Sequence, residues 1–453
     1  MSNRMKRSEG LSTIAAITFA VGTMIGAGVF VLSGIVVNVA GPGALVSYIA
    51  CAVLVLFSGL SYASLASIFP EDGGGYLFAE KILGKYPGFL TGWIMYIAQP
   101  IVLSFVLLGF GIYLNLLLGT TLDPRIYASG ALLLITALNI KGIAEAGRFE
   151  VAVVVAKVLI LILLIIVGIT FIQTSIFIPF MPHGIGGVAQ GIAMVFFAYM
   201  GFQVVAMMGG EVKQASKNVP LAMLASILIV GLVYVGVILA LLAANLPNYG
   251  NASVFDAALV LIGPLGGTVV ALGAVLSTLS SANALTAGSS RIIMEMASEK
   301  QIPGRYARLR NKQPVNALLL GAVVAFAFIL FGSLDFIIDL VNVAQLIAMF
   351  FVNVSAIALM RNVNKLVSGK SFFRIPLGIV LPSIGAISCI LAFISISFIT
   401  IAIGLVALLL GTLIYWSEDT PEGEKEIEKI ASILKRHTRE DTVDDSSDMV
   451  DFE

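Results

Sequence analysis

Three glycines interrupt an apolar stretch near the start of this 453-residue chain: Gly22, Gly26 and Gly28, in "AVGTMIGAGVFVLSG" (20–34). Gly26 and Gly28 would point to different faces of a helix, so an unwound segment explains them better than close packing of small residues, the alternative for each glycine alone. Unwinding would free N–H groups near Gly26 to bind an anion such as a carboxylate. It would also free carbonyls from Thr23 to Ile25 to accept from an ammonium group.

One ionisable side chain lies deep in an apolar run, Lys157 in "EVAVVVAKVLILILLIIVG" (150–168). A long side chain this close to the end of a span can extend to the membrane surface. Otherwise, a charge there costs at least about 2.5–3.5 kcal/mol and usually faces the protein interior for a functional reason. Because desolvation favours the neutral amine, Lys157 is a candidate proton carrier.

A second interruption is expected at Gly201, in the aromatic stretch "VFFAYMGFQ" (195–203). Five spans separate it from the first interruption, and an odd number of crossings inverts the chain direction. Glycine-interrupted spans at corresponding places in two inverted halves are typical of secondary transporters whose binding site lies between the repeats. Packing is again the alternative for Gly201 alone.

The composition shows which elements must position these residues. With 59% hydrophobic residues, 11% charged residues and a mean hydropathy of +1.03, the chain is predicted to be an all-α integral membrane protein. Twelve spans are predicted, at residues 11–37, 43–68, 88–118, 125–140, 150–172, 185–209, 219–243, 264–289, 315–333, 337–360, 375–395 and 397–416.

The positive charges predict the orientation of these spans. If the N-terminus is cytoplasmic and is retained, twelve crossings place 24 of the 26 Lys and Arg residues on the cytoplasmic side, with only Arg125 outside and Lys157 within a span. We therefore expect a multi-pass protein of the plasma or inner membrane, in contact with lipid, with both termini in the cytoplasm. Residues 417–453 hold 13 of the 26 acidic residues and form a predicted acidic cytoplasmic tail.

Several function classes find no support in the sequence. Cys51 and Cys389 lie in apolar spans and the chain has two His, so neither a disulfide nor a metal site is expected. The predicted cytoplasmic loops carry no phosphate loop, nucleotide fingerprint or nucleophile motif. We expect no enzyme, no cofactor, no metal and no nucleic-acid partner.

Four segments in order resemble the amino acid–polyamine–organocation (APC) superfamily of permeases. "GTMIGAGVF" (22–30) is similar to the signature of its first span, and "FPEDGGGYLFAEKILGKYPGFLTGW" (69–93) to its segment after the second. "FFAYMGFQVVAMMGGEVKQASKNVP" (196–220) resembles its sixth span and the following loop, and "RIIMEMASEKQIP" (291–303) with "PVNAL" (314–318) its loop after the eighth.

The resemblance implies a LeuT-type fold and a central amino acid site. Two inverted five-helix repeats (11–172 and 185–360) would be followed by two additional C-terminal helices (375–416), making residues 1–416 one transporter domain. By the family pattern, the amides of Gly26, Ala27 and Gly28 would bind the substrate carboxylate. Carbonyls near Ile25 and of Phe196, Phe197 and Ala198 would bind its ammonium group, with Phe202 or a neighbouring aromatic residue as a lid.

The resemblance also implies a role for Lys157. Sodium-coupled relatives hold Na⁺ between their first, fifth and eighth spans, and several sodium-independent or proton-coupled members place a lysine near that position. The amine of Lys157 would face carbonyls near Gly22 and Ile25 and hydroxyls of "STLSS" (277–281), with Ser280 and Ser281 as the chosen partners. Bonding of these serines to their own helix backbone is the alternative.

Departures from the family pattern affect the cytoplasmic gate and the substrate. Gln203, Ser64 and Gln214 replace residues that are common in the family, and Glu211 is either a gate residue or an ordinary loop carboxylate. Members that take cationic amino acids often carry a carboxylate where this chain has Ala98 or Gln99. Neutral amino acids, largely apolar or small, are therefore the expected substrates.

Three functions remain open from the sequence. A proton-coupled symporter is favoured, and the second is a sodium-independent exchanger in which Lys157 stays charged. The third is a non-transporting sensor or a channel. The two interrupted spans give no reason to prefer either of these. Coupling stoichiometry, the particular amino acid and the oligomeric state are left open.

Overall fold

The computed structural model describes residues 11–142, 147–310, 313–362 and 372–417. The first residues and the predicted acidic tail beyond residue 417 lie outside this part of the chain. The described residues are helical, with three isolated backbone bridges and no strand. The predicted all-α class is therefore confirmed.

The helices follow one another with short connections. Their bounds are α1 Thr13–Met24, α2 Ser33–Ala40, α3 Ala44–Ile68, α4 Gly75–Leu83, α5 Lys85–Leu118, α6 Pro124–Ile140, α7 Gly147–Thr170, α8 Gly184–Ala198, α9 Val204–Met207, α10 Ala215–Ala244, α11 Ser253–Ile262, α12 Pro264–Ser298, α13 Val315–Phe331, α14 Leu334–Arg361, α16 Val380–Ala392 and α17 Phe398–Ser417. A π-helix, η1 Gly28–Leu32, and 3₁₀ turns at 41–43, 174–177, 209–211, 304–306 and 393–395 complete the described elements.

Every predicted span contains helix, but seven helical stretches of the described chain are long and apolar enough to cross a membrane alone. They are Thr13–Ile68, Lys85–Leu118, Val151–Thr170, Ala215–Ala244, Pro264–Ser298, Leu334–Arg361 and Phe398–Trp416. The 56-residue first stretch covers two predicted spans, and shorter apolar helices occupy the fourth, sixth, ninth and eleventh. The count of twelve crossings stays a prediction.

Two helices outside the predicted spans are α4 and α11. Both are short and precede a long helix, α5 and α12, from which Gly84 and Gly263 separate them with φ angles of +107° and +93°. Ten or fewer residues between turn signals give little helical periodicity, so they were not predicted from the sequence. In addition, α12 continues nine residues beyond the predicted end at residue 289, to Ser298.

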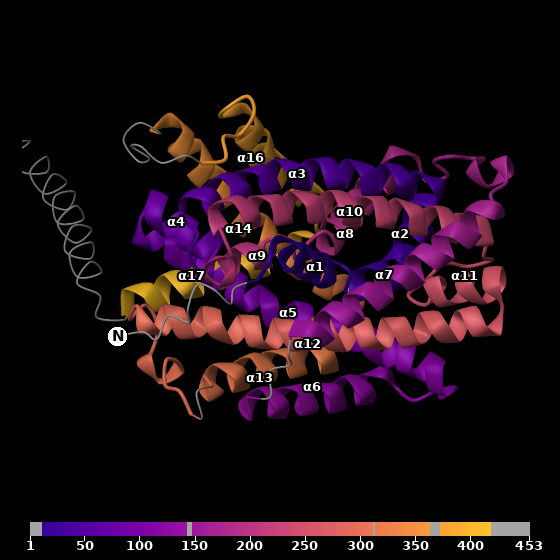
Figure 1. The fold of residues 1–453 in the computed structure, drawn as a ribbon, viewed down its shortest axis with the longest axis horizontal. Helices are drawn as coiled ribbons and strands as arrows, with labels where there is room; N and C mark the ends of the chain where they lie inside the picture. Colours follow the sequence, from indigo (N-terminus) through magenta and orange to yellow (C-terminus); the bar gives the residue numbers. More distant parts are fainter. Residues whose placement is uncertain (1–10, 143–146, 311–312, 363–371, 418–453) are drawn as a thin grey trace, which may run out of the picture.

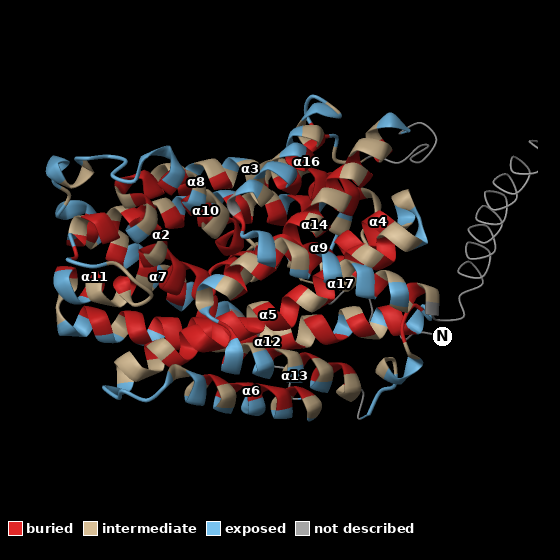
Figure 2. Ribbon diagram, turned by 180° about the vertical axis from the view of Figure 1, so that it is seen from behind, coloured by how far each residue is buried: buried red, intermediate tan, exposed pale blue. Residues whose placement is uncertain are grey.

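The long helices run roughly along the longest dimension of the molecule, and the short α1 lies among them (Figure 1). In the packing, α12 lies against α5, and α10 lies against α3 and α1. Buried residues concentrate on the central α5 and α12, whereas α6 and α13 at one edge carry many exposed ones (Figure 2). Exposed apolar side chains such as Ile166 on α7, Val323 on α13 and Leu409 on α17 give an outer surface suited to lipid tails.

Candidate functional site

The first predicted span is interrupted where the glycines occur. Helix α1 ends at Met24, Ile25 leaves the helical conformation with ψ of 69°, and the chain becomes helical again at η1, from Gly28. Side chains at the two glycines would meet other spans, since a Cβ on Gly26 would lie 3.1 Å from Ser281 Oγ and one on Gly28 would lie 3.3 Å from Ala198 Cα. The glycines therefore allow neighbouring spans to approach the interruption closely.

The second interruption lies directly against the first. Helix α8 ends at Ala198, and Gly201 has φ of +123°, which favours glycine. A Cβ on Gly201 would lie 2.9 Å from the backbone N of Met24. The two non-helical segments are thus in backbone contact. The sequence placed a binding site between them both through the pattern of two interrupted spans and through the family resemblance.

A tyrosine that the sequence reasoning missed joins the two interruptions. The hydroxyl of Tyr234, on α10, lies 2.8 Å from Met24 O and 2.8 Å from Ala198 O. One hydroxyl proton can serve only one of these carbonyls at a time. In the sequence, Tyr234 is one of several aromatic residues within an apolar span. Only the packing of α10 against α1 shows that it lies beside the two interruptions.

A pocket lies between the two interruptions. Its lining residues are Thr23, Met24, Gly26, Ala27, Gly28, Gln99, Val102, Val106, Phe197, Ala198, Met200, Gly201, Gln203, Val204, Ser281, Leu285 and Gln345. Five predicted substrate-binding residues are among them: Gly26, Ala27, Gly28, Phe197 and Ala198. These residues come from segments almost 170 positions apart in the chain.

The other three predicted substrate residues do not line the pocket. Ile25 is fully buried, and its carbonyl accepts a hydrogen bond from Ser277 Oγ at 2.9 Å. Phe196 is buried beside the pocket wall, and the Phe202 ring packs edge-on against Tyr62, with 5.6 Å between ring centroids. Among the named aromatic residues, Phe197 is the one at the pocket, and its ring lies 4.6 Å from that of Phe105.

The backbone N–H groups at the first interruption differ in whether they already have a hydrogen-bond partner within the protein. The Gly26 N–H, predicted to bind a carboxylate, donates to Met24 O at 2.9 Å. Ala27 and Gly28 stand at the start of η1, where the first N–H groups of a helix have no partner within the helix. A carboxylate at this terminus would meet the amides of Ala27 and Gly28, while Gly26 provides room.

Lys157 is buried beside the first interruption. Its side chain is 1% exposed, and Nζ donates to Gly22 O at 2.6 Å. The side chain therefore does not extend to the surface. Helices α1 and α7 can approach this closely because Gly22 lacks a side chain: a Cβ there would lie 2.4 Å from Val154 Cγ2.

The serines of α12 have different surroundings: one bonds to the first interruption and another faces the pocket. Ser277, which was not among the chosen residues, donates to Ile25 O, and Ser280 is 9% exposed. Ser281 faces the pocket, and its buried Oγ has no hydrogen-bond partner among the described residues. Ser277 lies four positions before the chosen Ser281 and therefore on the same helical face. A contact of Ser280 or Ser281 with Lys157 stays a prediction.

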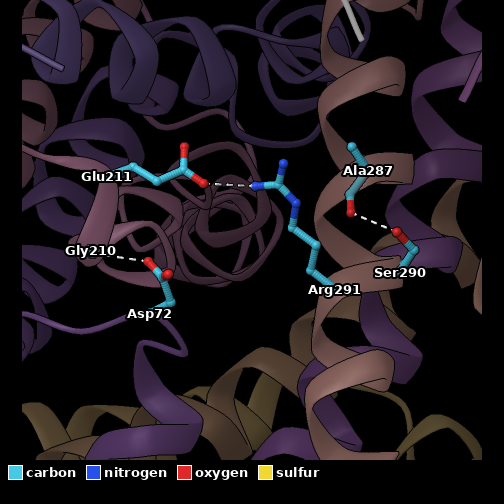
Figure 3. A network of polar contacts seen from close by, with 6 residues as sticks. All are labelled: Asp72, Gly210, Glu211, Ala287, Ser290 and Arg291. Atoms are coloured by element: carbon cyan, nitrogen blue, oxygen red, sulfur yellow. Dashed lines mark hydrogen bonds and ion pairs between the residues drawn. The ribbon is translucent and has the colours of Figure 1, made fainter. Parts of the chain in front are cut away.

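A polar cluster joins the segment before α1, the loop after α9 and helix α12. Glu211 and Arg291 form an ion pair at 3.2 Å, and Asp72 Oδ1 accepts from Gly210 N at 2.9 Å (Figure 3). Leu11, just before α1, exchanges backbone hydrogen bonds of 2.8 and 3.0 Å with Glu211 and Lys213. Glu211, whose pairing was left open by the sequence, thus joins the loop after α9 to α12.

Comparison with known proteins identifies the family. A family model described as "Amino acid permease" matches residues 11–416. The chain is 30% identical to the methylthioribose transporter of Bacillus subtilis, covering 90% of this chain and 92% of the relative, and 30% identical to the branched-chain amino acid permease BcaP of the same organism, covering 91% and 93%. It is also 30% identical to the B. subtilis serine/threonine exchanger SteT, over 66% of this chain and 70% of the relative.

These relatives are permeases and transporters, not enzymes, and the helices described above include several that can cross a membrane. The extent of the family match agrees with the four motifs noted in the sequence. The chain belongs to the amino acid permease family of the APC superfamily, whose members are multi-pass membrane transporters.

Proposed function

We propose that this permease is a proton-coupled symporter of neutral amino acids that works by alternating access in the plasma or inner membrane. The observation that carries the proposal is the hydrogen bond from buried Lys157 to Gly22 O, at the interrupted span that lines the pocket. A cation fixed at this place can couple its own protonation to the position of α1.

The proposed architecture is the LeuT type, with twelve crossings in two inverted repeats at 11–172 and 185–360, two extra helices at 375–416 and a cytoplasmic acidic tail from residue 417. Supporting it, the interruptions occur in the first and sixth predicted spans, which are the corresponding spans of two five-helix repeats. The distribution of Lys and Arg supports cytoplasmic termini.

The substrate would be held by its backbone groups at the two interruptions. The amides of Ala27 and Gly28 would donate to the carboxylate, aided by the positive end of η1. Carbonyls of the first interruption and of Phe197 and Ala198 would accept from the ammonium group. The Phe196 carbonyl, expected in the same role, belongs to a residue that does not line the pocket. Phe197 would close over the bound substrate, since it is the lining aromatic residue.

Lys157 would take the place of a sodium ion. When protonated, its amine would hold the Gly22 carbonyl and fix α1 against α7 and α12. Release of the proton toward the cytoplasm would remove the charge from that contact, loosen α1 and help the inner side open.

Exchange is the second candidate function. A hydrogen bond to the charged amine stabilises the charged form, and the Lys157–Gly22 bond is short enough to do so. If Lys157 kept its proton throughout the cycle, net uptake would need a second amino acid on the other side. SteT, a relative, is named as an exchanger.

Uptake of radiolabelled amino acids into sodium-free proteoliposomes tests both candidates. We expect an inward proton gradient to stimulate uptake by the wild type and by the control Lys141→Ala, whose lysine is exposed, but not by Lys157→Ala. Uptake that ignores the gradient and needs internal amino acid would replace symport by exchange. Failure of every amino acid to enter would reject amino acid transport.

A further inference from the structure

Three glutamine side chains meet at the pocket from three different elements. Gln99 comes from α5, Gln203 from the turn before α9 and Gln345 from α14, and all three line the pocket. They are 6%, 2% and 2% exposed, so they are enclosed by protein. Buried amides are normally hydrogen-bonded, and those that are not require an explanation.

Part of the cluster has its hydrogen bonds satisfied within the protein. Gly201 N donates to Gln203 Oε1 at 3.2 Å, and Gln203 Nε2 donates to Gln345 Oε1 at 3.3 Å. These bonds fix the orientation of Gln345, because its oxygen faces Gln203. The Nε2 group of Gln345 therefore keeps both of its hydrogens available for donation to other acceptors.

The remaining polar groups have no partner within the described part of the chain. Within the described part of the chain, neither the Gln99 amide nor Gln345 Nε2 makes a hydrogen bond, and Ser281 Oγ is buried without one. An amide offers both a donor and an acceptor, so Gln99 could receive either kind of group. The pocket therefore presents hydrogen-bonding capacity to whatever occupies it.

The rest of the lining has no formal charge. Among the described lining residues there is no Asp, Glu, Lys, Arg or His, and Val102, Val106 and Leu285 supply apolar surface. A charged substrate side chain would be desolvated here without a partner of opposite charge. A purely apolar one would displace water from Gln99 and Gln345 and leave their amides unpaired.

We infer that the preferred substrate is a neutral amino acid with a hydroxyl or carboxamide side chain, recognised by Gln99 and Gln345. This inference rests on the proposed amino acid site and narrows its substrate class from the neutral, largely apolar or small amino acids expected from the sequence. The hydroxyl or amide would exchange hydrogen bonds with Gln99 and accept one from Gln345 Nε2. The aliphatic part of the side chain would lie against Val102, Val106 and Leu285.

Uptake of near-isosteric substrate pairs tests the assignment. Threonine with valine, asparagine with leucine, and glutamine with methionine would each be supplied, radiolabelled and well below saturation, to sodium-free proteoliposomes of the wild type. We expect the polar member to be favoured roughly tenfold or more in at least one pair, since one unpaired buried amide is enough for that ratio. Wild-type preference for the apolar member, or no preference, in all three pairs would overturn the inference.

Variants connect the preference to the named side chains. Gln99→Leu and Gln345→Leu should each reduce the polar preference several-fold, whereas Gln190→Leu, the same change at an exposed position of α8, should preserve it. A preference that survives both pocket changes would contradict the inference even if the wild type favours polar substrates. Uptake dominated by apolar members would leave the proposed amino acid transport intact, while no uptake of any of the six would reject both.

Discussion

At the scale of single residues, the account depends on side chains that satisfy backbone groups freed by the interruptions. Lys157 bonds to Gly22 O, Ser277 to Ile25 O, and Tyr234 reaches both Met24 O and Ala198 O. A carbonyl freed inside a membrane protein must find such a donor, because leaving it bare costs about 1–3 kcal/mol. Each donor therefore helps to determine the stability of the interrupted conformation.

Tyr234→Phe tests this role for the residue that touches both interruptions. We expect a several-fold rise in KM for amino acid uptake, because the carbonyl ends of the site lose the donor that fixes their spacing. The ratio of uptake with and without a proton gradient should stay at the wild-type value, since Lys157 is intact. Tyr249→Phe is the matched control, as its hydroxyl bonds to Leu241 O at 3.3 Å, outside the pocket lining.

At the scale of elements, the segment between α8 and α9 approaches α1 closely because Gly201 lacks a side chain. Gly201→Ala would place a Cβ 2.9 Å from Met24 N and would hold a non-glycine residue at φ of +123°. We expect loss of uptake and a lower melting temperature, with a destabilisation of about 1–3 kcal/mol. Gly186→Ala, on α8 with open space around it, should leave both unchanged; a fully active Gly201→Ala would contradict the contact.

The contact between α1 and α7 can be tested with one substitution that disrupts it and a second that should restore it. In Gly22→Ala, the new Cβ would lie 2.4 Å from Val154 Cγ2. The resulting clash would separate the Gly22 carbonyl from Lys157. We expect gradient-stimulated uptake to fall at least tenfold. Adding Val154→Ala should restore much of it, because the Cβ that alanine keeps lies 3.5 Å from the added methyl group. Equal defects in the single and double variants would show that crowding at this contact is not the cause.

At the same scale, the sequence predicted which segments are helical much better than it predicted which side of each helix faces the binding site. Positions such as Gly22, Gly26 and Lys157 stood out because glycine clusters and a buried charge are costly inside an apolar span. Tyr234 and Gln345 did not stand out, and Ser277 stood out only as part of the motif "STLSS", because a membrane helix is apolar on all sides and its pattern does not show which side meets the site. Short α4 and α11 were missed since their periodicity covers ten residues or fewer.

At the scale of the whole molecule, the proposed alternating access would require the span ends assigned to the cytoplasmic side to separate. The Glu211–Arg291 pair and the backbone bonds of Leu11 now join the segment before α1, the loop after α9 and α12. The pair is partly exposed, with side chains 43% and 58% exposed, so it contributes at most about 1 kcal/mol. A contribution of that size can shift the balance between two conformations without holding either one permanently.

Breaking the ion pair should therefore favour the inward-open state. In Arg291→Ala, a cysteine introduced at Thr23 of the pocket should react several-fold faster with a reagent added from the inner side, whereas Arg308→Ala, at an exposed residue, should not change the rate. The swap Glu211→Arg with Arg291→Glu should bring the rate back toward the wild type. An unchanged rate in Arg291→Ala would mean that the pair is a surface contact without a gating role.

Proton movement accompanying amino acid entry tests the central claim most directly. A pH-sensitive dye trapped in sodium-free proteoliposomes would report the internal pH after transported amino acid is added outside. We expect internal acidification with the wild type and with Lys141→Ala, and none with Lys157→Ala at matched protein content. Net amino acid uptake without acidification in the wild type, or the same acidification in Lys157→Ala, would contradict the assignment of Lys157 as the proton carrier.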